Sequence, residues 1–135
     1  MNNCDYIYKE LDKACKQSDC IGLSGMDVYC FDKKNYIDEF NQAFLIDIED
    51  GLFKQTDKTF RETMIDLLGK DIQDGFLKKV NDIIKSDTKV IRIDNSIVYD
   101  MLSGPFGLSP FFFLEDFFFV EGKDKMYCFM TGNNE

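Results

Sequence analysis

The last quarter of the chain carries two apolar runs, FFFLEDFFFV at residues 111–120 and MYCFM at residues 126–130. A strand with one buried face alternates apolar and polar residues, and neither run does so. Between them, GKDK at residues 122–125 is typical of a turn that joins two antiparallel strands. We therefore expect strands over residues 111–121 and 126–131 that form a C-terminal β-hairpin with two apolar faces.

The two apolar faces of such a hairpin can be accommodated in two arrangements. In the first, it is the centre of a sheet and other elements cover both of its faces. In the second, one face remains partly open as an aromatic patch rimmed by acids, which is the composition of a protein-binding interface. In either arrangement Glu115-Asp116 separates two phenylalanine triplets and protects the stretch against aggregation.

The remainder of the chain is mainly helical by its hydrophobic periodicity. We expect amphipathic helices over residues 3–17, 34–49 and 71–86, with Asn3 as the N-cap of the first. Thr59 and Glu62 fit a capping box at the start of a further helix. Residues 28–31 and 89–93 have the pattern of short strands, residues 96–102 of a short helix or turn, and residues 103–110 of a loop.

This order of elements predicts one α+β domain over residues 1–135, a mostly antiparallel sheet packed by about four helices. The length of 135 residues suits a single domain, and 44% apolar with 30% charged residues is a globular composition. The chain has no apolar run of membrane-spanning length and no secretory signal pattern at its start. We therefore expect a cytoplasmic protein.

Histidine is absent, and the five cysteines are scattered without any C-x-x-C spacing: Cys4, Cys15, Cys20, Cys30 and Cys128. This pattern disfavours a zinc site and favours free thiols in a reducing compartment. It also removes the nucleophile–histidine pairs and the histidine general base on which many hydrolases depend.

The other catalytic and binding motifs fail on their spacing. Asp50-Gly51 and Asp74-Gly75 lack the upstream acids of a calcium loop, and no glycine-rich phosphate loop is present. Neighbouring acids such as Asp38-Glu39 point in different directions, as solvated surface acids do. We expect a protein that is not an enzyme and has no cofactor or metal. A carboxylate-dependent hydrolase using Mg²⁺ or Mn²⁺ is the alternative.

The formal charge of −9 disfavours direct contact with nucleic acid or anionic membranes and favours a basic protein partner. The charge is uneven, because residues 94–121 hold five acids and no Lys or Arg, and residues 27–50 hold seven acids against two lysines. From these segments we take as contact candidates Asp94, Asp100, Glu115, Asp116 and Glu121, followed by Asp47, Glu49 and Asp50.

The C-terminal stretch FFFLEDFFFVEGKDKMYCFMTGNNE, the acidic single-domain character and the Lys/Asn/Asp/Ile-rich composition resemble the small immunity proteins of bacterial toxin–immunity systems. These include the immunity proteins of contact-dependent growth inhibition. The resemblance implies that the chain binds and neutralises a cognate toxin domain, for which a basic nuclease is the expected type. It implies no particular fold and no catalytic residue. A general interaction or adaptor module remains a further alternative, and the oligomeric state stays open.

Overall fold

The computed structural model describes residues 2–17, 25–93, 95–104 and 113–133. Helices and strands alternate irregularly along these residues, and the sheet is assembled from segments far apart in the chain. In chain order the elements are α1 (Asn3–Gln17), β1 (Gly25–Phe31), α2 (Tyr36–Phe44), the 3₁₀ turn η1 (Asp50–Leu52), β2 (Phe53–Thr59), α3 (Phe60–Leu68), α4 (Lys70–Val80), β3 (Lys89–Ile93), α5 (Ser96–Leu102), β4 (Phe113–Glu121) and β5 (Met126–Asn133).

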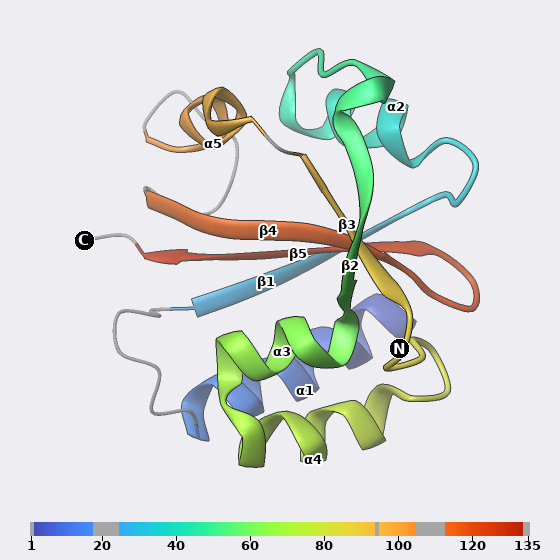
Figure 1. Ribbon diagram of the computed structural model, residues 1–135, viewed down its shortest axis with the longest axis vertical. Coiled ribbons are helices and arrows are strands. Elements are labelled where there is room, and N and C mark those ends of the chain that lie inside the picture. Colours follow the sequence, from blue (N-terminus) through green and yellow to red (C-terminus); the bar gives the residue numbers. More distant parts are fainter. Residues whose placement is uncertain (1, 18–24, 94, 105–112, 134–135) are drawn as a thin grey trace.

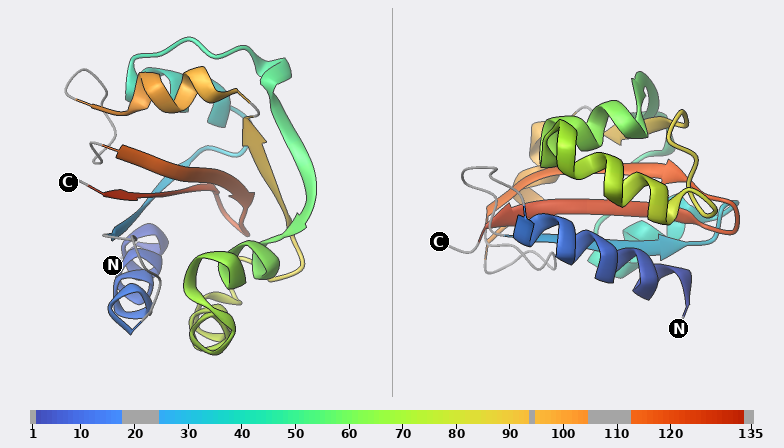
Figure 2. Two further views of the ribbon diagram at one scale, coloured as in Figure 1. Left: turned by 60° about the vertical axis from the view of Figure 1, so that its left-hand side comes forward. Right: turned by 90° about the horizontal axis from the view of Figure 1, so that it is seen from below.

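The five strands form one antiparallel sheet in the order β1-β5-β4-β3-β2. The C-terminal hairpin β4–β5 lies inside this sheet, with β1 on one side and β3 on the other. Helices lie on both faces: α1, α3 and α4 cover one, whereas α2 and α5 cover the other (Figures 1 and 2). The predicted α+β class, the antiparallel sheet and the C-terminal hairpin are confirmed.

Consecutive phenylalanines of β4 enter opposite cores. Phe117 and Phe119 pack with α2 and α5, whereas Phe118 and Val120 pack with the residues of α1, α3 and α4. Phe118 stacks on Phe129 of β5 with ring centroids 5.2 Å apart. All these side chains are buried, because each face of a central strand must be covered when both carry apolar residues.

The covered central hairpin is therefore the arrangement that the structure shows. An exposed aromatic patch is wrong for Phe117–Phe119, whose exposed fractions do not exceed 1%. Phe111 and Phe112 lie outside the described residues.

Side-chain caps explain where α1 and α3 begin. Glu62 donates its backbone N–H to Thr59 Oγ1 at 3.1 Å, and Thr59 donates its backbone N–H to Glu62 Oε1 at 3.2 Å. This confirms the predicted capping box of α3. The N-cap prediction for α1 was one residue late, because Asn2 Oδ1, not Asn3, accepts the N–H of Asp5 at 2.8 Å.

The helix predicted over residues 34–49 is shorter, since α2 ends at Phe44 and Leu45 adopts a left-handed conformation with φ 53°. Asn41 fixes the segment that follows. Its side chain accepts the Ile48 N–H at 2.9 Å and donates to the Ile48 carbonyl at 3.0 Å. Ile48 is thereby held in the core, while the chain passes on to η1 and β2.

Strand β2 was not predicted. Its sequence FKQTDKT lacks an apolar period of two, and this is compatible with an edge position, where one side of a strand contacts solvent. The helix predicted over residues 71–86 spans only Lys70–Val80 as α4. The segment after it continues as one more helix-like turn, in which the N–H of Ile84 donates to the Val80 carbonyl at 2.9 Å.

Candidate protein-binding surface

The two helical layers of the domain differ in charge. Within the described residues, the segments that carry α1, α3 and α4 (3–17 and 60–88) hold nine acids against eight Lys and Arg. The segments that carry α2, η1 and α5 (32–52 and 95–104) hold seven acids against two lysines. We call this second set of segments the acidic layer. The net charge is therefore −5 in the acidic layer and −1 in the layer on the opposite face of the sheet.

The acidic layer also carries exposed apolar side chains. The large apolar side chains that the structure shows as exposed are Leu45 (79%), Ile97 (62%), Met101 (41%) and, on α1, Tyr8 (42%). Three of these four belong to the acidic layer. Ile97 and Met101 are four residues apart on α5 and so share one side of that helix. Apolar groups surrounded by charged ones are the ordinary anatomy of a protein–protein interface.

Leu45 combines exposure with an unfavourable backbone conformation. Among the described residues it is the one non-glycine residue with positive φ, a conformation that costs an L-residue about 1–2 kcal/mol. An exposed leucine contributes little burial energy to offset this cost. The left-handed residue ends α2, where the Leu45 N–H donates to the Gln42 carbonyl at 3.4 Å and the Ile46 N–H donates to the Asn41 carbonyl at 3.0 Å. The exposure of the leucine side chain at this helix stop, and not its φ, makes Leu45 a contact candidate.

Four of the predicted contact acids lie in the acidic layer. Asp47, Glu49 and Asp50 are exposed in the segment between α2 and β2, and Asp100 is exposed on α5. Buried neighbours such as Ile48 and Val98 anchor both segments to the same core cluster. Figure 2 shows the segment after α2 running along the same layer as α5. The second choice of the sequence analysis is thus brought onto one face with Asp100.

The remaining candidates do not join them as one patch. Glu115 is exposed near the start of β4, while Glu121 is at its far end, about 20 Å away for a strand of this length. Glu121 lies 4.0 Å from the ammonium of Lys33. Asp94 lies outside the described residues.

Asp116, another predicted contact residue, is already paired within the chain. Its carboxylate forms an ion pair with Arg92 of β3, and both side chains are largely shielded from solvent. Tyr99 of α5 donates its hydroxyl to Asp116 Oδ1 at 3.4 Å. Burial, together with the nearby Asp116 charge, raises the pKa of Tyr99. The absence of Lys and Arg from residues 94–121 suggested that the acids of this segment have no cation partner. The partner of Asp116, however, is Arg92, which lies just before the segment.

The three apolar members of the surface, Leu45, Ile97 and Met101, were not among the predicted contact residues. The apolar stripe of the helix predicted over residues 34–49 places Leu45 inward beside Phe44, and this prediction is wrong, since Leu45 is 79% exposed. For α5, the short helix holds buried Val98 and Leu102, and Ile97 and Met101 each precede one of them. A short helix that carries apolar residues on its exposed side as well as on its buried side is expected to make contacts beyond the core of its own domain.

No donor cluster for a metal is found in the described part of the chain, where no three Asp, Glu or Cys side chains gather suitably. Among the described helices, none combines the length and apolar character needed to cross a membrane. No disulfide joins any two of the described cysteines Cys4, Cys15, Cys30 and Cys128. Comparison of the chain with models of protein families, with curated proteins and with solved structures gave no match.

Proposed function

We propose that this chain is a binding protein that neutralises a basic protein partner, with the acidic layer as its docking surface. The observation that carries the proposal is the coincidence, on one face of the sheet, of the acid excess and three exposed apolar side chains. The acids would attract a basic partner from a distance and speed its association. Leu45, Ile97 and Met101 would then supply the contact area that slows dissociation.

The resemblance to toxin-immunity proteins supports a toxin domain as the partner. The stretch that carries this resemblance, residues 111–135, is largely the hairpin β4–β5 inside the sheet. Its phenylalanines Phe117, Phe118, Phe119 and Phe129 are buried, so the apolar contact residues of the proposed surface come from other segments. A cytoplasmic immunity protein fits this division, because the scaffold supplies rigidity while surface segments supply specificity for one toxin.

The test is co-expression with the product of the neighbouring gene in the native operon. We expect that product to be toxic alone, to be tolerated with this chain, and to co-elute with it in gel filtration. A non-toxic product, or a pair that elutes separately, contradicts the immunity role. A non-toxic product that still co-elutes would favour the adaptor alternative.

Pairs of variants that remove equal charge from the two layers test whether the acidic layer is the docking surface in that complex. Glu49→Gln with Asp100→Asn removes two charges from the acidic layer, whereas Asp71→Asn with Asp87→Asn removes two from the opposite layer. We expect the first pair alone to slow association at low salt, by about tenfold. Leu45→Ser and Ile97→Ser should instead speed dissociation. Equal effects of the two charge pairs would show that net charge, and not this surface, governs binding.

A further inference from the structure

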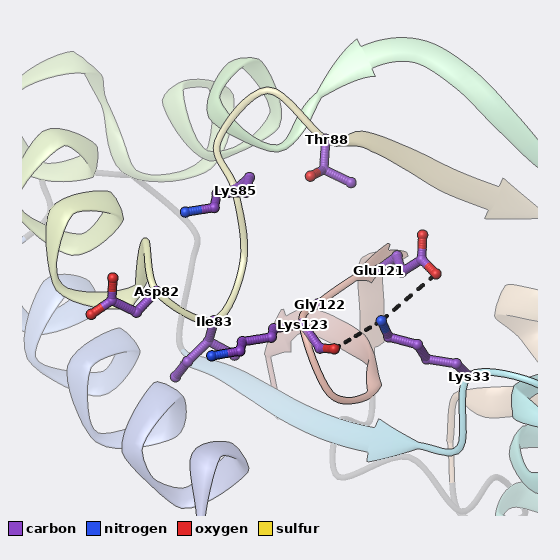
Figure 3. A pocket seen from close by; sticks show the side chains of 8 residues that line it. All are labelled: Lys33, Asp82, Ile83, Lys85, Thr88, Glu121, Gly122 and Lys123. Carbon is purple, nitrogen blue, oxygen red and sulfur yellow. Dashed lines mark hydrogen bonds and ion pairs between the residues drawn. The ribbon is translucent and has the colours of Figure 1, made fainter.

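A cavity of about 660 Å³ opens at the end of the sheet that bears the β4–β5 turn. Three segments distant in sequence form it: the β4–β5 turn, the connection between α4 and β3, and Lys33 from the connection between β1 and α2 (Figure 3). Its volume is in the range of small-molecule sites. Its lining residues are Lys33, Asp82, Ile83, Lys85, Thr88, Glu121, Gly122 and Lys123.

Hydrogen bonds hold the walls of this cavity in place. The Lys123 N–H donates to the Ile83 carbonyl at 2.7 Å, and the Gly122 N–H donates to the Lys125 carbonyl at 2.8 Å. Gly122 lies so close to the ring of Tyr127 that a Cβ would come within 2.5 Å of its Cε2 atom. The Tyr127 hydroxyl in turn donates to Asp124 at 2.8 Å. The cavity is therefore preformed, which lowers the entropic cost of binding a ligand.

The charges around the cavity are unlike those of the protein as a whole. The Lys33 ammonium donates to the Lys123 carbonyl at 2.9 Å and lies 4.0 Å from the Glu121 carboxylate. The charges of Lys33 and Glu121 therefore offset each other. Among the described residues, the ammonium groups of Lys85 and Lys123 have no carboxylate partner. Both extend toward the side of the cavity where Asp82 lies (Figure 3). A chain of charge −9 thus presents two unpaired cations in one hollow.

We propose that this cavity binds a small phosphorylated polyol, with the phosphate group held by Lys85 and Lys123. Ammonium groups form charge-assisted hydrogen bonds with phosphate oxygens. The Thr88 hydroxyl at the cavity wall is an added donor. Asp82 and Glu121 repel a bare anion, and they suit a ligand whose hydroxyl groups donate to carboxylates. The site shares only Lys33 with the acidic layer and does not depend on the proposed function.

Calorimetric titration of the full chain at constant ionic strength tests this proposal. The probes are ribose 5-phosphate, inorganic phosphate and ribose. We expect ribose 5-phosphate to bind about tenfold more tightly than either of the other two, because only it engages the lysines and the carboxylates together. Absence of heat with ribose 5-phosphate, or equal binding of ribose, would overturn the proposal.

A matched pair of double variants separates a site from general charge attraction. Lys85→Gln with Lys123→Gln should weaken ribose 5-phosphate binding by about tenfold or more. Lys9→Gln with Lys54→Gln removes the same charge elsewhere and should leave binding unchanged. Amide NMR shifts on titration should centre on Lys85, Thr88, Gly122 and Lys123. Equal weakening by both pairs, or shifts centred elsewhere, would refute the site.

Discussion

Arg92 of β3 and Asp116 of β4 form an ion pair near Ile91 and Phe119, the one register pair that joins these two strands among the described residues. The second guanidinium nitrogen donates to Asp116 Oδ2 at 3.3 Å, and the first also contacts the Phe117 carbonyl at 3.5 Å. The guanidinium carbon lies 5.5 Å from the centroid of the Phe118 ring. Arg92 thereby joins the β2–β3 pair to the rest of the sheet where backbone pairing is sparse.

Replacing Arg92 with Met should lower the free energy of unfolding by about 2 kcal/mol, because Asp116 is left partly buried without its cation. Arg92→Lys should recover only part of the loss, since lysine cannot form the two-nitrogen contact. Urea denaturation measures both. The control is Lys58→Met, which breaks the exposed Lys58–Asp66 pair and should cost less than about 1 kcal/mol. Equal losses would mean that the Arg92 pair has no special structural role.

Leu45→Asn should raise the free energy of unfolding by about 0.5–1 kcal/mol, because Asn tolerates the left-handed conformation better than Leu does. Leu45→Ala keeps the unfavourable φ and should give no such gain. The measurement is again urea denaturation. In the complex with the partner, both variants should bind more weakly, as expected when stability is sacrificed for function. A loss of stability in Leu45→Asn would refute the strain.

Gly122→Ala should be destabilising by about 1–3 kcal/mol, since the new methyl group would overlap the Tyr127 ring and approach the Ile83 carbonyl. Gly75→Ala, in α4, meets no atom within 4 Å and should stabilise the helix by about 1 kcal/mol. Thermal denaturation of the two variants checks the opposite signs. Similar melting temperatures would contradict the close packing at the β4–β5 turn.

Asp124 links the turn to the start of α1, because it accepts from Tyr127 at 2.8 Å and from the Asn3 side chain at 2.9 Å. Slight burial opposes ionisation, but these hydrogen bonds lower the pKa of Asp124. A carboxyl whose folded pKa is depressed stabilises the fold above its unfolded pKa, near 4, and loses that contribution as pH falls through the folded value. Unfolding free energies at pH 6 and pH 3 should therefore differ less in Asp124→Asn than in the parent chain. An unchanged difference would contradict this role.

The described thiols should differ in reactivity although no disulfide joins any two of them. Burial, with a contribution from neighbouring Cys30, raises the pKa of Cys4 to about 12, which lowers its thiolate fraction at pH 8 by about a thousandfold. Cys128 is completely buried. Mass spectrometry after iodoacetamide treatment should find Cys4 and Cys128 unmodified in the folded chain and alkylated in urea. Fast labelling of Cys4 in the folded chain would contradict the raised pKa of its thiol.

Local sequence determined a large share of this fold. The capping box at Thr59 and Glu62, the strand Lys89–Ile93 and the C-terminal hairpin all follow from short-range patterns. The two-sided apolar character of β4 also indicated its covered position. Each of these features depends on residues near one another in the chain, so propensity, capping and periodicity suffice to predict it.

Tertiary structure alone decided which charges and apolar groups share a face. The polar strand β2 is a strand because β3 offers it a partner, and Asp116 is neutralised by a residue 24 positions earlier. Leu45 is exposed because Asn41 and Ile48 redirect the chain after α2. Such outcomes depend on the free energy with which distant segments pair, and a local sequence pattern does not predict that free energy. The sequence therefore predicted the scaffold, while packing determined the acidic layer and the lysine-lined cavity.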